Sequence, residues 1–149
     1  TKMKKGFCVI DFGVKYKGYC SDITRTIYIG KPKKGETEIY NSLLKIQNDT
    51  INQVKENKKC SELYDFVSRN LGNYKKYFTH GLGHGVGVEI HEMPNLTLNS
   101  KDRIKNSMVF TIEPGIYIPK KFGIRIEDTL LFKNKPIVLT KTEKDLLIV

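Results

Sequence analysis

Five side chains in this sequence make up a set of ligands suited to two divalent metal ions. The set consists of four carboxylates and one imidazole, namely Asp11, Asp22, Glu113, Glu127 and His84. Oxygen ligands with a single imidazole suit hard divalent cations. Four neighbouring carboxylates with no cation between them would repel one another. The residue types therefore predict a dinuclear metal hydrolase, provided that the fold brings these side chains together.

The two aspartates flank a segment that has the signals of a β-hairpin. The intervening residues are rich in aromatic and β-branched side chains and contain the turn signal Lys17-Gly18. If the turn is centred between Tyr16 and Lys17, Asp11 lies directly opposite Asp22, with Cβ atoms about 5 Å apart. Two facing carboxylates require a positive charge between them, and a metal pair would supply it.

The segment GIRIEDTL at 123–130 alternates apolar and polar side chains, as a half-buried strand does. Ile124 and Ile126 are predicted to face the core. Arg125 and Glu127 then point to the opposite side. This strand is therefore expected to deliver one cation and one carboxylate to the site.

Glu113 and His84 both occupy positions at which functional groups tend to collect. Glu113 follows an apolar run, residues 108–112, and the Pro114-Gly115 pair after it predicts a turn at a strand end. His84 stands among glycines, which permit positive φ angles and a close approach of the backbone to a ligand. Both side chains are therefore candidates for metal binding.

Two amphipathic helices are expected between the carboxylate motifs. Residues 36–56 carry apolar side chains close to helical spacing, and residues 61–71 repeat the pattern. The order of elements is then a hairpin, two helices and further strands. This order predicts an α+β fold in which the helices back a curved antiparallel sheet and the metals lie on its open face.

Three stretches resemble the catalytic domain of the pita-bread metallopeptidases. They are DFGVKYKGYCSDITRT at 11–26, HGLGHGVGVEIHEMP at 80–94 and TIEPGIYIPKKFGIRIED at 111–128. The EPGIY and GIRIED elements are similar to the Xaa-Pro aminopeptidase and Xaa-Pro dipeptidase (prolidase) branch. The resemblance implies the pita-bread (creatinase/aminopeptidase-like) fold, with 1–149 as the C-terminal part of a metallopeptidase catalytic domain. Because the sequence opens at Thr1, close to the first ligand, the fold is expected to be incomplete at its N-terminal side.

The resemblance also implies how the metals are held. Asp11 would chelate one ion, and His84 and Glu113 would chelate the other. Asp22 and Glu127 would bridge the two ions, and a metal-bridging hydroxide would attack the carbonyl before proline. Manganese is the expected metal, with cobalt or zinc as alternatives.

The same resemblance implies catalytic and substrate-binding roles. His91 and Glu113 would be catalytic, because His91 would stabilise the oxyanion and Glu113 would carry the proton. His80, His91 and Arg125 would bind the substrate. The implied activity is removal of an N-terminal residue from Xaa-Pro peptides, and a homodimer is implied for the full-length protein.

The net charge of +10 raises a second hypothesis, a non-catalytic pita-bread module that binds nucleic acid or a protein partner. The lysines are scattered in short pairs, which is more typical of a solvated surface, and all five candidate ligands are kept. These observations favour the enzyme and make nucleic acid an unlikely partner. Methionine aminopeptidase-like activity is a third hypothesis, because those enzymes share the His-Gly and Glu-Pro elements.

Cysteine usage and apolar patterning bear on the compartment. Cys8, Cys20 and Cys60 are odd in number and have no paired spacing, which disfavours a disulfide framework and indicates a reducing compartment. The sequence contains no apolar run long enough to cross a bilayer, so no membrane partner is expected. The expected location is the cytoplasm.

Overall fold

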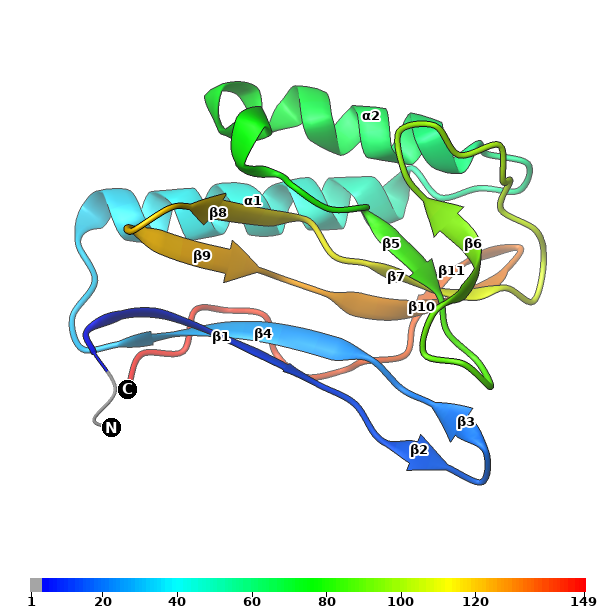
Figure 1. Ribbon diagram of the computed structural model, residues 1–149, viewed down its shortest axis with the longest axis horizontal. Helices are drawn as coiled ribbons and strands as arrows, with labels where there is room; N and C mark the ends of the chain where they lie inside the picture. Colours follow the sequence, from blue (N-terminus) through cyan, green and yellow to red (C-terminus); the bar gives the residue numbers. More distant parts are fainter. Residues whose placement is uncertain (1–3) are drawn as a thin grey trace.

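Two α-helices lie over antiparallel strands in a computed structural model that describes residues 4–149, so Thr1 lies outside the described residues (Figure 1). The helices are α1 (Lys34–Asn52) and α2 (Cys60–Asn70), and a 3-10 helix, η1 (Gly72–Tyr77), follows them. No helix within the described range has both the length and the apolar character needed to cross a membrane. The predicted α+β architecture, with helices backing antiparallel strands, is confirmed.

The first helix starts earlier and ends earlier than the predicted range 36–56. It starts earlier because the Glu36 side chain accepts a hydrogen bond from the Lys33 backbone N–H at 2.7 Å, which satisfies one of the free donors at the helix start. It ends at Asn52 although Val54 fits the helical spacing. Val54 is buried from the turn after the helix, where its N–H donates to the Ile51 carbonyl.

The strands form one larger sheet and three two-stranded ribbons. The sheet has the order β11 (Lys135–Val138), β10 (Asp128–Lys133), β7 (Val109–Ile112), β5 (Gly83–Gly85), β6 (Glu92–Leu96). The ribbons are β1 (Gly6–Phe12) with β4 (Ile23–Ile29), β2 (Lys15–Tyr16) with β3 (Tyr19–Cys20), and β8 (Gly115–Ile118) with β9 (Phe122–Arg125). All of these strand pairs are antiparallel.

The hairpin register differs from the predicted one. Lys17 and Gly18 form the two-residue turn, with φ angles of 49° and 87°, so the turn is centred between them and not before Lys17. Asp11 therefore pairs with Thr24, and the prediction that it lies directly opposite Asp22 is wrong. Asp22 is two residues before Thr24, which places it diagonally across from Asp11 on the same side of the ribbon. Positive φ at both central residues is what a tight two-residue hairpin turn requires.

The predicted strand over 123–130 is divided in two. β9 ends at Arg125 and pairs with β8, whereas β10 begins at Asp128 and pairs with β7. Ile126 and Glu127 connect them at the point where the partner strand changes. The predicted alternation survives this break, because both isoleucines of the apolar face are fully buried. The connection places Glu127 between the β8–β9 ribbon and the five-stranded sheet, not within one flat sheet.

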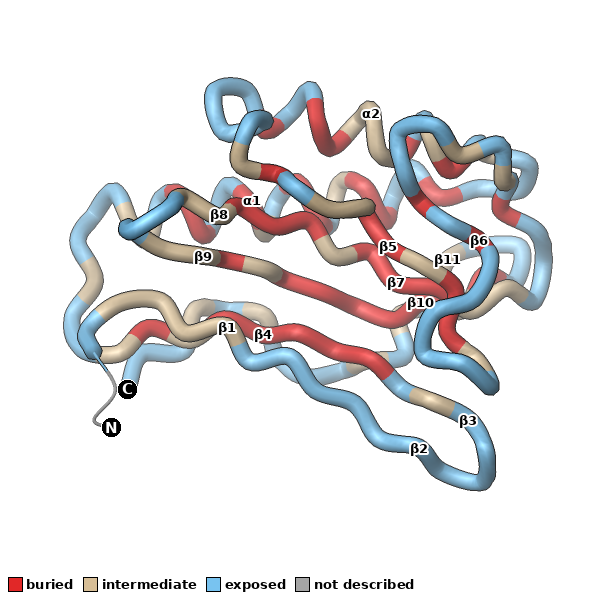
Figure 2. The backbone as a smooth tube through the Cα atoms, in the orientation of Figure 1, coloured by how far each residue is buried: buried red, intermediate tan, exposed pale blue. Residues whose placement is uncertain are grey.

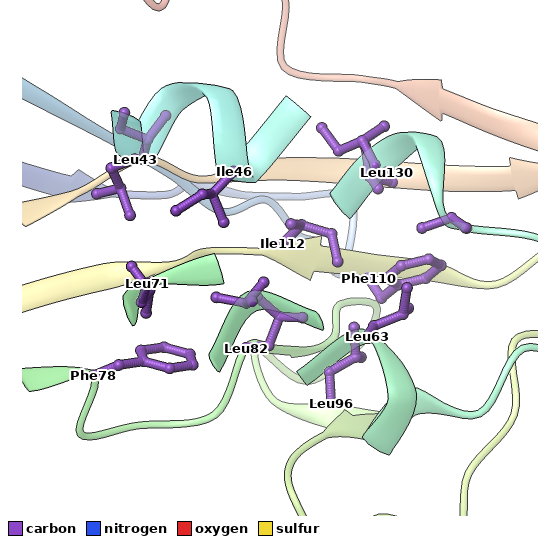
Figure 3. Packing of buried hydrophobic residues seen from close by; sticks show 14 of the residues in the cluster. Leu43, Ile46, Leu63, Leu71, Phe78, Leu82, Leu96, Phe110, Ile112 and Leu130 are labelled. Atoms are coloured by element: carbon purple, nitrogen blue, oxygen red, sulfur yellow. The ribbon is translucent and has the colours of Figure 1, made fainter. Parts of the chain in front are cut away.

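The core lies between the helices and one face of the strands. Side chains of α1, α2 and β7 meet there, including Leu43, Leu63 and Phe110, which are all 0% exposed (Figure 3). Truncating such a side chain to alanine typically costs about 2–5 kcal/mol. The β2–β3 hairpin is mostly exposed and extends away from this core (Figure 2). The core thus fixes the strands from the helix side and leaves their opposite face for polar groups.

Candidate metal centre

A cavity of about 510 Å³ opens on the strand face that the helices do not cover, and all of the predicted site residues line it. They are Asp11, Asp22, His80, His84, His91, Glu113, Arg125 and Glu127. The residues come from distant parts of the sequence and from both the sheet and two of the ribbons. The cavity is therefore a product of the whole fold, not of one motif.

Asp22, His84 and Glu127 form the tightest group in the cavity. One ligand atom from each residue lies within 4.8 Å of the others. The His84 Nε2 atom is 3.5 Å from Asp22 Oδ2 and 3.3 Å from Glu113 Oε1. Two or three carboxylates around one imidazole nitrogen form a donor set that fits a hard divalent cation.

Two threonines orient the acids, and sequence reasoning missed both. Thr24 Oγ1 donates to Glu127 Oε2 at 2.6 Å. Thr111 Oγ1 donates to Glu113 Oε1 at 3.1 Å and accepts from the His84 backbone N–H at 3.1 Å. Such partners fix the direction in which a ligand oxygen points. The sequence signal for them was weak. It was only that each threonine lies two residues from a candidate ligand in an alternating strand.

Asp11 lines the cavity but does not join the tight group. Its carboxylate pairs with the Arg125 guanidinium, and its side chain is 51% exposed. Arg125 Nε also donates to Thr24 Oγ1 at 3.0 Å. Asp11 and Arg125 therefore form an ion pair in this structure. Both were predicted as site residues, but this pairing was not predicted.

A second polar chain runs along the side of the cavity. Arg125 Nη1 donates to the Tyr117 hydroxyl at 3.0 Å, and this hydroxyl is 3.0 Å from His80 Nε2. His80 Nδ1 lies 2.7 Å from the Gly81 carbonyl, which therefore accepts its proton. Tyr117 is part of the quoted EPGIY element, yet it was not predicted as a site residue. The chain links His80 to Arg125 along one wall of the cavity, where His80 Nδ1 is 4.0 Å from Glu113 Oε2 and Arg125 pairs with Asp11.

His91 stands at the exposed rim of the cavity. Its ring packs edge-on against the ring of His84, with centroids 4.1 Å apart. The His84 imidazole belongs to the tight group, and the His91 imidazole lies next to solvent. His91 is therefore close enough to contact a molecule that enters the cavity.

Two glycines allow β5 to carry His84 between its neighbours. A Cβ on Gly83 would lie 2.0 Å from the Thr111 carbonyl oxygen, and one on Gly85 would lie 2.2 Å from the Met93 carbonyl oxygen. Neither glycine has a positive φ angle. The expected close approach thus occurs, but toward the backbone of neighbouring strands and not toward a ligand.

The acids of the cavity shift one another's pKa. Burial and the nearby charge of Glu113 raise the pKa of Glu127 to about 8. Burial likewise raises the pKa of Asp22. Burial would also raise the pKa of Glu113, but the hydrogen bond and charge of His84 outweigh it, so this pKa is lowered. Burial and mutual repulsion thus oppose ionisation of Glu127 and Asp22, and a bound metal ion would favour their ionised forms.

A family model described as Metallopeptidase family M24 matches residues 1–134. A Xaa-Pro dipeptidase of Pyrococcus horikoshii is 47% identical over 143 residues, which are 93% of this chain and 40% of that protein. This chain thus spans about two fifths of the length of the curated relatives it matches.

Solved structures give the same picture of the fold. The crystal structure of a recombinant prolidase from Thermococcus sibiricus matches with a TM-score of 0.95 at 37% identity, over 100% of this chain and 42% of that chain. The X-Pro aminopeptidase of Thermotoga maritima matches with a TM-score of 0.90 at 35% identity, over 96% of this chain and 42% of that one.

Proposed function

This chain belongs to metallopeptidase family M24, and we propose from this premise that its acidic cavity holds two divalent metal ions and hydrolyses the bond before proline in Xaa-Pro peptides. The predicted resemblance to the Xaa-Pro branch is confirmed by the names of its relatives, and the predicted pita-bread fold by the matched structures. The observation that carries the proposal is the convergence of Asp22, His84 and Glu127 in the wall of the cavity.

The proposed ligands are Asp11, Asp22, His84, Glu113 and Glu127. Divalent ions bound there would act as Lewis acids that polarise a carbonyl and lower the pKa of water. Manganese is the first candidate, with cobalt or zinc as alternatives, because oxygen ligands dominate the set. Asp11 must exchange its partner before it can bind an ion, since its carboxylate now pairs with Arg125.

Three groups of the chain would handle the substrate. His91, at the rim next to His84, would donate to the carbonyl oxygen as negative charge develops on it. Glu113, whose pKa is lowered by His84 in spite of its burial, is ionised at neutral pH and would accept a proton and pass it on. The wall of His80 and Arg125, held by Tyr117, would receive the proline ring.

We also propose assignments for the domain, the oligomeric state and the compartment. Residues 1–149 would be the C-terminal part of a metallopeptidase catalytic domain, and the full-length protein would be a homodimer. The three free thiols, Cys8, Cys20 and Cys60, are consistent with the reducing environment of the cytoplasm.

The test is manganese-dependent hydrolysis of Ala-Pro, Ala-Pro-Ala and Met-Ala-Ser, followed by mass spectrometry. It should be run on this chain and on a fusion to the preceding part of a full-length relative. Cleavage of either proline peptide supports the proposal and separates a dipeptidase from an aminopeptidase, whereas cleavage of Met-Ala-Ser alone supports the methionine aminopeptidase-like alternative. A metal-loaded fusion that cleaves none of the three would contradict the proposed activity.

A further inference from the structure

A second buried carboxylate, Asp128, lies directly next to Glu127 in the sequence but faces away from the cavity. Asp128 is 0% exposed. Its Oδ1 atom accepts hydrogen bonds from Arg25 Nη2 and Thr140 Oγ1, each at 2.8 Å. Its Oδ2 atom accepts from Gln47 Nε2 at 2.8 Å and from Lys144 Nζ at 2.9 Å. A carboxylate has about four acceptor sites, so Asp128 is fully satisfied by the protein.

Arg25 uses its whole guanidinium group in the same region and is itself 8% exposed. A guanidinium has five N–H donors in a rigid planar fork. Those of Arg25 donate to the carboxylate of Asp128 and to four backbone carbonyls, namely those of Thr24, Glu127, Thr142 and Glu143. Arg25 thus ties β4 to the start of β10 and to the C-terminal segment.

Arg25 and Asp128, with the hydrogen bonds that link them, form a clamp on the side of β4 that faces away from the cavity. Consecutive residues of β4, and of the connection between β9 and β10, alternate between this side and the cavity side. Thr24 and Arg25 are neighbours in β4, so their side chains point to opposite faces. Thr24 lies on the cavity side, where its hydroxyl donates to Glu127 Oε2 at 2.6 Å. On the other face Arg25 holds the carbonyls of Thr24 and Glu127, while the Glu127 N–H donates to the Thr24 carbonyl at 3.1 Å. The clamp therefore fixes the register in which Thr24 meets Glu127.

We propose that Arg25 and Asp128 are positioning residues for Glu127, which set the geometry of the metal ligands from behind the strand through Thr24. The inference rests on the proposed function, because it assumes that Glu127 binds a metal ion. Metal coordination tolerates only small errors in ligand position. A small loss of register between β4 and the β9–β10 connection would therefore weaken ion binding even though no ligand had been changed.

The test is Mn²⁺ affinity, measured by titration calorimetry on the purified chain and on variants shown to be folded by circular dichroism. Asp128→Asn removes the charge that holds Arg25, and Arg25→Lys keeps the charge but cannot reach all five acceptors. Both variants should weaken Mn²⁺ binding by about 10-fold or more. If Asp128→Asn does not fold, the milder Arg25→Lys variant decides.

A double-variant cycle distinguishes positioning from a general loss of stability. Thr24→Val should weaken Mn²⁺ binding as well, and the Arg25→Lys/Thr24→Val pair should be weaker by less than the product of the two single effects, because both changes act on the same ligand. Thr24→Ser, which keeps the hydroxyl, should restore most of the affinity.

Tyr40→Phe serves as the matched control. It removes the hydrogen bond from the buried Tyr40 hydroxyl to the Lys144 carbonyl at 2.7 Å, in the same region, and leaves every hydrogen bond of Arg25 and Thr24 in place. Its Mn²⁺ affinity should stay within about twofold of the parent. A folded Arg25→Lys variant that also stays within that range, or a fully multiplicative cycle, would overturn the inference alone. Absence of Mn²⁺ binding by the parent chain would overturn the proposed metal site and the inference with it.

Discussion

Buried carboxylates have opposite environments on the two faces of the strand connection at residues 127–128. On the helix side, Asp128 has a protein donor for every acceptor site. On the cavity side, Asp22, Glu113 and Glu127 crowd around His84, and the guanidinium that lines the cavity, that of Arg125, is paired with Asp11. Both faces are built from the same segments of chain.

Buried charges that belong to structure thus differ from those that await a ligand. A satisfied carboxylate such as Asp128 strengthens the fold only as long as all its partners remain. The crowded acids of the cavity are destabilising by themselves, because their charges repel and they are removed from water. The fold keeps them at a cost in stability, which is typical of functional sites.

The largest effect is expected from breaking the satisfied side. Asp128→Asn should lower the free energy of unfolding by about 3–5 kcal/mol, because the buried charge of Arg25 and the partly buried charge of Lys144 lose their counterion. Urea titration followed by circular dichroism measures this change. A loss of less than about 1 kcal/mol would mean that the Asp128 network does not stabilise the fold as the contrast requires.

The matched change on the cavity side should act on metal binding and not on the fold. Glu127→Gln should weaken Mn²⁺ binding by at least about 100-fold, equivalent to about 3 kcal/mol, and abolish peptide hydrolysis by the metal-loaded fusion. Its stability without metal should not fall at neutral pH, because Thr24 can still donate to the amide oxygen and Glu127, with its pKa raised to about 8, is itself mostly uncharged there. Calorimetry and thermal melting without metal provide the two readouts, and normal hydrolysis by this variant would refute the role of Glu127.

The stability contributed by Glu127 and that contributed by Asp128 should depend on pH in opposite directions. The native pKa of Glu127, raised by burial and by Glu113 to about 8 from 4.5, means that the folded metal-free chain binds an extra proton between these values. Stability should therefore fall by up to a few kcal/mol as pH rises from about 4.5 to about 8. For Asp128, burial opposes ionisation, but its donors prevail and lower its pKa below 3.8, so its contribution is lost only as pH falls through the acid range.

Chemical denaturation of the metal-free chain at several pH values tests this expectation. Glu127→Gln is the control, because it should flatten the slope between pH 4.5 and 8 and leave the acid limb unchanged. A stability that rises with pH across that window would contradict the account of Glu127.

The smallest effects should come from removing one hydroxyl on each face. Thr140→Val deletes one of the donors to Asp128 and should cost about 1–2 kcal/mol of stability, while Mn²⁺ affinity stays within about twofold because Arg25 keeps all five of its acceptors. Thr111→Val deletes the donor to Glu113 and should weaken Mn²⁺ binding by about 10-fold. Parallel melting and calorimetry on both variants should show a loss of stability for Thr140→Val and a loss of Mn²⁺ affinity for Thr111→Val. The reverse pattern would contradict the difference between the two faces.

Sequence reasoning found the chemistry of the site more readily than its geometry. The alternation of 123–130 correctly assigned Arg125 and Glu127 to the cavity, because a period of two survives even where the strand breaks. The pairing of Asp11 was wrong because it depends on where one tight turn is centred, and a shift of one residue at the turn moves every partner.

The clamp behind the site could not be predicted from the sequence. Arg25 and Asp128 are far apart in the chain, and neither the spacing nor the residue types around them indicate a contact. Asp128 also follows Glu127 directly, so a reading for metal ligands draws attention to its neighbour. Contacts of this kind depend on the tertiary arrangement of β4, β10, α1 and the C-terminal segment.

A crystal of the chain soaked in manganese, with anomalous diffraction used to locate the ions, would show whether the acidic cavity binds metal. We expect anomalous peaks within bonding distance of Asp22, His84 and Glu127, the release of Asp11 from Arg125, and no peak at Asp128. Saturating manganese that leaves the cavity without a peak, with the Asp11–Arg125 pair intact, would show that the crowded face is not built for cations.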